Sequence, residues 1–397
     1  MAVSQNLSAP KRPWLLVAGD TVLMRPSRCE PRLRELIRSA DTAFANLEAP
    51  LTSRGVPAEK AATHRADPDC AQWLLDLGFT AVTLANNHAL DYGPAGLEDT
   101  IQALRQAGIA HVGAGASSQE ALAPLVTQTS SGSVAVIGLC AALPPGFAAT
   151  DTRPGVAPLR VLQQVSVDPA LAAEQPGMAP FVHTSVHPPD LLAACESVRR
   201  ARESADVVIV AVHWGIPHGF AAPSYGPLAE YQQPVGRALI DAGATLVIGH
   251  HPHLVQHVER YAGGLIAYSV GNFMFHNWDR FSGQGPDQSA ASTPAGAETG
   301  LFPLQIPSAP YRSSFGAAET LDSVVVLLTS PSEGPVSVQF VPTTMTNGDP
   351  VIPTANQCQA ILDRLDRGSS TTSGDLALRL RTDLVPGAVV GEVRLNG

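Results

Sequence analysis

Carboxylate, amide and imidazole side chains gather at five places in the sequence, each directly after an apolar run of the kind that forms a buried β-strand. In chain order these places are Gly19-Asp20, Asn46-Leu47-Glu48, Asn86-Asn87-His88 with Asp91, His213-Trp214-Gly215 and Gly249-His250-His251-Pro252-His253. Carboxylate and amide oxygens bind hard cations, and imidazole nitrogens bind transition metals. Carboxylates and histidines collected in one crevice without a cation would leave buried charge unpaired. The residue types therefore indicate a divalent metal site.

The candidate metal ligands are Asp20, Glu48, Asn87, His213, His251 and His253. Taken alone, the Gly-Asp step and the pair His88 and Asp91 are also typical of turns and caps. The cluster from His250 to His253 is a stronger signal, because Pro252 prevents a regular helix and neighbouring imidazoles rarely satisfy one another in a core. Which of its three histidines bind metal and which transfer protons is left open. The remaining histidines without motif context are expected on the surface or in the core: His64, His111, His183, His187, His257 and His276.

Alternating strand-like and helix-like segments must position these groups. Strands are expected at residues 14–18, 43–45, 80–84, 134–139, 206–212, 245–248 and 265–270, and helices at 32–39, 70–77, 96–107 and 228–242. This alternation is typical of βαβ units around a mostly parallel sheet, in which the carboxyl ends of the strands share one edge. A late hairpin is expected from residues 324–328 and 336–340. The five polar segments should therefore converge on one crevice.

Two stretches break this alternation. Residues 142–190 and 278–314 are rich in Pro, Gly, Ala and Ser and show little periodicity. Long segments of this kind often serve as functional lids, so we expect loop or lid insertions that shape substrate binding. They belong to one expected domain that covers residues 12–397.

The composition excludes several classes of protein. A hydrophobic fraction of 45% is too high for a disordered chain, and 25 Lys+Arg against 35 Asp+Glu give a net charge of −10, which argues against nucleic acid as a partner. The apolar stretch after Lys11 and Arg12 is too short for a signal-peptide core, and no apolar run is long enough to span a bilayer. We therefore expect no membrane association and a cytoplasmic location. Five widely spaced cysteines predict buried free thiols.

The sequence phrases at residues 44–51, 84–93, 212–215, 249–253 and 268–273 resemble the CapA (PgsA-like) capsule-synthesis proteins of the calcineurin-like metallophosphoesterase superfamily. Their order and spacing match over about residues 14–275. The resemblance implies an α/β fold, the calcineurin-like metallophosphoesterase sandwich of mixed β-sheets flanked by helices. It also implies that the six candidate ligands bind metal and that His88 with Asp91 forms an acid/base pair.

The sequence departs from the family pattern at three positions. Val22 stands where the phosphatases of the superfamily have a histidine, so one of two metal positions loses a ligand and a mononuclear site is a reasonable expectation. His250 replaces a glycine that usually precedes the ligand histidines. Pro217 stands where the CapA-type motif usually has a glutamate, which puts that glutamate's role in doubt here.

We interpret the chain as a metal-dependent peptide epimerase, similar to the CapA-like epimerases of lasso-peptide biosynthesis. Such an isomerase inverts the Cα of a residue, here the C-terminal one of a ribosomal precursor peptide. Inversion needs a base on one face of the Cα and an acid on the other. His88, oriented by Asp91, would serve one face, and His253 paired with Asp20 would serve the other.

Two other functions remain open: a metal-dependent phosphoesterase, and a protein of capsule or poly-γ-glutamate biosynthesis. The lost histidine weakens the phosphoesterase, and the acidic charge without an anchor weakens the capsule role. A pure binding protein is a further alternative. The expected cofactor is a divalent ion, with calcium, manganese or magnesium at least as suitable as zinc, and no organic cofactor. The expected partner is a peptide substrate, and the oligomeric state is left open.

Overall fold

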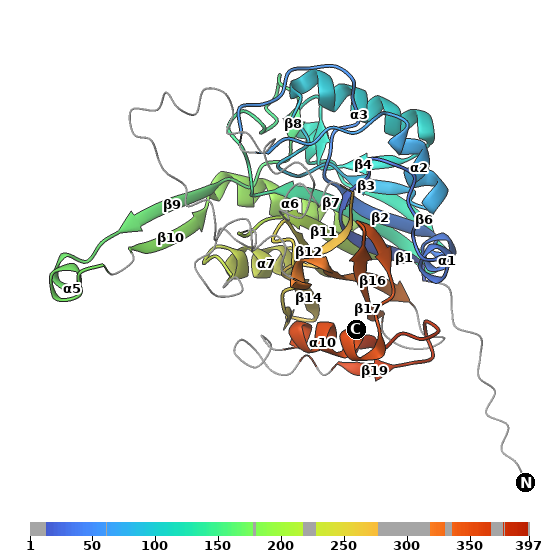
Figure 1. Ribbon diagram of the computed structural model, residues 1–397. Helices are drawn as coiled ribbons and strands as arrows, with labels where there is room; N and C mark the ends of the chain where they lie inside the picture. The colour runs from blue at the N-terminus through green and yellow to red at the C-terminus, as the bar shows by residue number, and fades with distance from the viewer. Residues whose placement is uncertain are drawn as a thin grey trace, which may run out of the picture.

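Two mixed β-sheets pack against each other, and helices cover their outer faces (Figure 1). This computed structural model describes residues 13–60, 62–177, 180–216, 228–276, 318–329, 336–366, 376 and 378–395. The first sheet has the strand order β19-β20-β17-β16-β1-β2-β3-β4, with β15 beside β1 and β18 beside β17, and the second has the order β13-β14-β12-β11-β7-β6. The expected α/β sandwich is confirmed. The alternation of segments alone indicated one mostly parallel sheet, and this was wrong, because the parallel strands divide between two sheets.

Parallel strands form one side of the first sheet, out to its edge at β4, and the centre of the second sheet, and antiparallel strands complete both. The first sheet contains β1 (Leu15–Val22), β2 (Thr42–Leu47), β3 (Ala81–Thr83), β4 (Ala110–Val112), β15 (Asn272–Phe275), β16 (Asp322–Thr329), β17 (Ser337–Thr346), β18 (Asp349–Val351), β19 (Arg379–Arg381) and β20 (Val390–Arg394). The second contains β6 (Leu125–Thr129), β7 (Gly132–Cys140), β11 (Val207–His213), β12 (Leu246–His250), β13 (Val258–Tyr261) and β14 (Gly264–Ala267). The expected late hairpin is the antiparallel pair of β16 and β17.

Side-chain alternation along the strands divides the core into three clusters. In β1, Leu16 and Ala18 face the helices α1 (Pro31–Ser39), α2 (Cys70–Leu77) and α3 (Gly93–Ala107). Leu15 and Val17 of the same strand face the second sheet. The outer face of the second sheet packs on α6 (Pro188–Ser204) and α7 (Gln232–Asp241). Because successive side chains point to opposite faces of a strand, strands that are apolar throughout fit between two packed layers.

Part of the first expected insertion is regular structure. Residues 142–190 contain β8 (Gly155–Val156), β9 (Val161–Ser166), α5 (Pro169–Glu174) and β10 (Phe181–Val186), and β9 pairs with β10 in an antiparallel hairpin. Figure 1 shows this hairpin extending away from the body, with α5 at its tip. β8 pairs with β5 (Ala114–Gly115), which precedes the short α4 (Ser118–Ala121). The second expected insertion, residues 278–314, lies outside the described residues.

The C-terminal part of the chain packs against the sandwich. The helix α10 (Ala355–Asp366) buries Ile361, Leu362 and Leu365 in the cluster between the sheets. All five cysteines are buried and free, as expected. Within the residues that the structure describes, no helix combines the length and the apolar character needed to cross a bilayer.

Candidate metal centre

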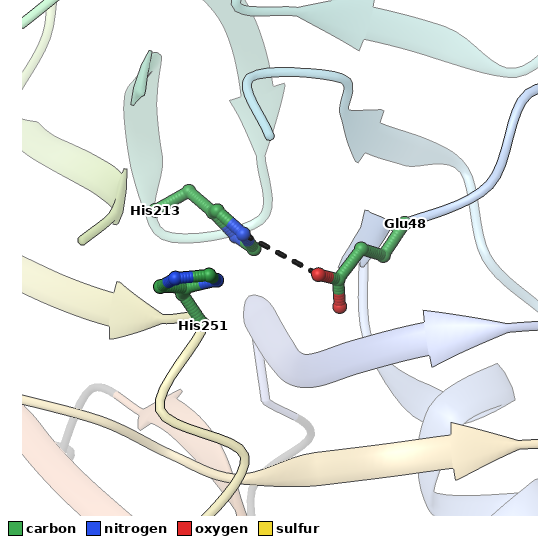
Figure 2. A group of neighbouring side chains, drawn as sticks. All are labelled: Glu48, His213 and His251. Atoms are coloured by element: carbon green, nitrogen blue, oxygen red, sulfur yellow. Dashed lines mark ion pairs between the residues drawn. The ribbon is translucent and has the colours of Figure 1, made fainter. Parts of the chain in front are cut away.

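Two groups of side chains that could each hold a metal ion lie at the carboxyl ends of the central strands. Glu48, His213 and His251 form one group (Figure 2), and Asp20, Glu48 and His253 form the other. Within each group the ligand atoms lie within 4.8 Å of one another, and every member is buried. The first sheet contributes the two carboxylates and the second contributes the three imidazoles. Residues far apart in the sequence are thus brought together where the two sheets meet.

Glu48 belongs to both groups and is the most unusual group in the site. Its side chain is fully buried, and neither carboxylate oxygen has a hydrogen-bond partner among the described residues. Figure 2 shows the carboxylate pointing toward His213, and Oε1 lies 3.3 Å from the His213 Nε2. Burial, followed by the negative charge of Asp20, raises the pKa of Glu48 well above its ordinary value. A divalent cation between these residues would supply the missing partner.

Asp20 joins the strand ends of both sheets. Its Oδ1 accepts a hydrogen bond from the Asn46 side-chain amide at 2.8 Å, and its Oδ2 accepts one from the backbone N–H of His251 at 3.0 Å. The Nδ1 atoms of His250 and His253 lie 3.1 and 3.5 Å from its carboxylate. Burial raises the pKa of Asp20, but the hydrogen bond with His250 and the charges of the neighbouring histidines outweigh it, so the net pKa is lowered. Asp20 is therefore held as an ionised carboxylate.

His213 and Asn87 connect the two sheets directly. The Nε2 of His213 lies 2.9 Å from the Asn87 Oδ1, and its Nδ1 lies 3.2 Å from the Asn46 Nδ2. Burial lowers the pKa of His213 to about 3, and burial also lowers the pKa of His251 well below its ordinary value. Deprotonated imidazole is the form that binds metal. All six ligands expected from the sequence thus lie in one network, in which Asn87 is half-buried and the other five are buried.

The turn that carries the histidine cluster is strained. His251 and His253 have φ angles of 96° and 59°, in the left-handed region that non-glycine residues seldom adopt. The Nδ1 of His253 lies 2.8 Å from the Asn272 Oδ1, which helps to hold the imidazole ring in place. Such strain persists only where the surroundings enforce it, and it is common at functional sites. Of the three histidines, His251 and His253 belong to the two groups, and His250 lies beside Asp20.

His88 and Asp91 form the expected pair next to the metal groups. The His88 Nδ1 lies 2.6 Å from the Asp91 Oδ2, and the His88 backbone N–H donates to the Asn86 Oδ1 at 3.0 Å. Burial lowers the pKa of His88 well below its ordinary value, and the charge of Lys60 lowers it further. Burial also raises the pKa of Asp91. Asn87, the residue before His88, contacts His213, so the pair lies next to the two groups that could hold a metal ion.

Sequence reasoning missed Lys60 and His64. The Lys60 Nζ donates to the Asp91 Oδ1 at 2.7 Å, and the His64 ring centroid lies 4.0 Å from that of His88. The loop that carries them has no periodic pattern to reveal it. One signal was present in the sequence: lysine is rare in this chain, which has two lysines, Lys11 and Lys60.

Among the motif positions in doubt, Val22 is a fully buried residue at the end of β1. Pro217 lies outside the described residues.

Comparison with known proteins shows the family of this chain. The family model of the bacterial capsule synthesis protein PGA_cap matches residues 3–277. The chain belongs to this family. It is 30% identical to the PGA biosynthesis protein CapA of Bacillus subtilis over 249 residues, which are 62% of this chain and 56% of that protein. The chain thus spans little more than half the length of this relative.

Two further relatives show how far the similarity extends. A probable polyglutamine synthesis accessory protein of Mycobacterium tuberculosis is 32% identical over 259 residues, 64% of this chain and 60% of the relative. An uncharacterized protein of Sinorhizobium fredii is 26% identical over 434 aligned positions, 94% of this chain and 92% of the relative. The region shared with the capsule proteins contains every candidate ligand, from Asp20 to His253.

Proposed function

We propose that this member of the capsule synthesis family is a divalent-metal-dependent enzyme that acts in the synthesis of a poly-γ-glutamate-type polymer. The observation that carries the metal is the buried Glu48 carboxylate, which lacks a hydrogen-bond partner among the described residues and belongs to both ligand groups. The capsule role is supported by the family and by the names of the Bacillus and Mycobacterium relatives. The comparisons favour it over the peptide epimerase expected from the sequence.

The residues present fit a divalent ion. Asp20, Glu48 and Asn87 offer oxygen atoms, and His213, His251 and His253 offer nitrogen atoms, a mixed set suited to Mn²⁺ or Zn²⁺. Because Glu48 is common to both groups, its two oxygens could serve two neighbouring ions. When bound, the metal supplies positive charge that stabilises negative charge on a substrate.

The chain's own residues supply proton transfer. His88 has its Nδ1 engaged with Asp91, and its Nε2 is the nitrogen available to take or give a proton. The net charge of −10 argued against a polyanionic substrate, but the field at a site is set locally. Here the bound cation would face the carboxylates of the polymer.

The peptide epimerase is our second candidate, and one observation favours it. The site contains two separate imidazole–carboxylate pairs, His88 with Asp91 at 2.6 Å and His253 with Asp20 at 3.5 Å. Two such pairs are what inversion of a Cα requires. A cytoplasmic location and a peptide partner belong to this candidate and stay predictions.

One experiment separates these functions. The protein, loaded with Mn²⁺ or Zn²⁺ or stripped by a chelator, is incubated in deuterium oxide with poly-γ-glutamate oligomers, a ribosomal-type peptide and a generic phosphoester. We expect a metal-dependent change in the polymer, seen by mass spectrometry as new amine ends or as deuterium at Cα. His88→Ala should abolish it, and His111→Gln in β4 is the matched histidine control.

The other outcomes have definite meanings. An unchanged polymer in the presence of bound metal would exclude it as a substrate. Deuterium at the C-terminal Cα of the peptide alone would favour the epimerase, and phosphate release alone would favour the phosphoesterase. Full turnover by His88→Ala would exclude the acid/base role of His88.

A further inference from the structure

We propose that Lys60 is a positioning residue that holds the His88–Asp91 pair in its working geometry. This inference rests on the proposed acid/base role of His88. It concerns a residue outside every motif in the sequence, in the loop between β2 and α2.

The Lys60 ammonium contacts the chain on both sides of His88. It donates to the backbone carbonyl of Asn87 at 2.5 Å and to the Asp91 Oδ1 at 2.7 Å, and it lies 3.3 Å from the His88 Nδ1. The residue before the histidine and the carboxylate after it are thus tied to one charged group. This fixes the turn on which His88 stands.

The two oxygens of Asp91 divide their partners. Oδ1 accepts from Lys60, while Oδ2 lies 2.6 Å from the His88 Nδ1 and also accepts the backbone N–H of His64 at 2.6 Å. With Oδ1 held by the ammonium, the carboxylate cannot rotate freely, and Oδ2 stays directed at the imidazole. The His88 ring is therefore held with Nδ1 toward Asp91 and with Nε2 free for proton transfer.

Burial makes this cation important. The Asp91 side chain is 0% exposed and that of Lys60 is 17% exposed, so the ion pair is largely shielded from water. Removing one partner of a buried pair leaves the other charge uncompensated. Lys60 also lies 5.6 Å above the Phe147 ring, which comes from the first expected insertion and limits where the ammonium can move.

Two substitutions test the proposal. Lys60→Met keeps the length of the side chain and removes its charge, and Lys60→Arg keeps the charge. Arg65→Met is the matched control, because it removes one positive charge from the same loop at an exposed side chain that lies over the Tyr92 ring.

The first readout needs no substrate. Nitrogen-15 NMR of histidine-labelled protein reports which ring nitrogen of His88 carries the hydrogen and whether it is hydrogen-bonded. We expect the hydrogen-bonded Nδ1–H signal of His88 in the wild type, its loss in Lys60→Met, partial return in Lys60→Arg and no change in Arg65→Met. An unchanged His88 signal in Lys60→Met overturns the proposal.

The second readout is turnover of the substrate found above. Lys60→Met should lower kcat by about 100-fold, the lower end of what a positioned acid/base group supplies, while KM and metal content stay near wild type. A rise in KM with unchanged kcat would instead make Lys60 a substrate-binding residue and overturn the positioning role. If no substrate is turned over, the proposed function fails, and the NMR result still decides whether Lys60 orients His88.

Discussion

Glu48 is the residue whose environment most clearly calls for a cation. The sequence predicted it as a ligand because it follows a buried strand. The structure adds that Glu48 belongs to both ligand groups and that its carboxylate has no hydrogen-bond partner among the described residues. Lys60 and His64 could not be predicted, because side chains on an aperiodic loop are placed by tertiary contacts. The orientation of His251 and His253 depends on a left-handed turn that sequence spacing does not encode.

We predict that Glu48→Gln changes stability with opposite signs in the absence and presence of metal. Without metal it should raise the unfolding free energy by about 1 kcal/mol, because a carboxyl group with a strongly raised pKa is removed from a buried site. With Mn²⁺ at about 100 times its Kd, the wild type should gain about 2.7 kcal/mol, and the variant should lose most of this gain.

Urea denaturation with chelator and with Mn²⁺ measures both effects of Glu48→Gln. Glu259→Gln is the matched control, because Glu259 is a buried carboxylate that already pairs with Arg237 and accepts a hydrogen bond from Tyr268. It should destabilise the protein equally with and without metal. Equal metal stabilisation of wild type and Glu48→Gln would contradict the assignment of Glu48 as a ligand.

At the scale of elements, the order of strands and helices could be predicted, but their division between sheets could not. Periodicity reports which faces of an element are buried, and both faces of β1 and of β11 are buried whichever sheet they join. Periodicity did not show how many sheets the strands form, and the two-sheet sandwich was predicted from the resemblance to a family. The β9–β10 hairpin was missed although its strands, VLQQVS and FVHTSV, are strand-like, because they lie within a segment whose overall composition is rich in Pro, Gly, Ala and Ser.

The β9–β10 hairpin should contribute little to stability. Leu162 in β9 is 54% exposed, whereas Leu239 in α7 is fully buried. Leu162→Ala should lower the unfolding free energy by less than about 0.5 kcal/mol, and Leu239→Ala by about 2–5 kcal/mol. Thermal unfolding of the two variants checks this. A large loss for Leu162→Ala would mean that another molecule covers the hairpin in solution.

Asp349 ties β18 to the segment after β1. Its carboxylate accepts hydrogen bonds from Ser27 Oγ and the Arg28 backbone N–H at 2.8 and 2.9 Å, and it pairs with Arg25 and His276. Burial raises the pKa of Asp349, but these bonds outweigh it, and the net pKa lies below the ordinary 3.8. The stabilisation is therefore present above pH 3.8 and is lost as the pH falls through the lowered pKa.

Asp349→Asn should accordingly cost about 1–3 kcal/mol at pH 7 and progressively less below pH 3.8. Urea midpoints of variant and wild type over this range measure the difference. Asp383→Asn is the control, because Asp383 pairs with Arg381 at an exposed position and should cost less than about 1 kcal/mol. A difference between Asp349→Asn and wild type that does not shrink with acid would show that the carboxylate charge is not the stabilising feature.

For the whole molecule, buried histidines determine how the unfolding free energy changes as the pH falls. The pKa values of His64, His88 and His251 lie well below 6.5, and that of His213 is about 3, each chiefly because of burial. Between these values and 6.5 the unfolded chain binds protons that the folded chain does not, so the unfolding free energy falls as the pH falls below 6.5. The metal-free protein should thus be acid-sensitive.

We expect this sensitivity to be large, since each such histidine contributes about 1.4 kcal/mol one pH unit below its unfolded pKa. Urea unfolding in chelator at pH 8 and pH 5.5 measures it. Equal stability at the two pH values would show that these imidazoles are accessible to protons in the folded state.

The centre also takes its residues from both sheets, and the hydrogen bond from the His251 backbone to Asp20 spans 231 positions in the sequence. Contacts of such separation form late in folding, because long loops must close before they can be made. A chain with one sheet assembled would hold only one or two of the three residues of each ligand group. Metal uptake during refolding therefore reports when the two sheets dock. Recovery of bound metal should lag behind recovery of β-structure.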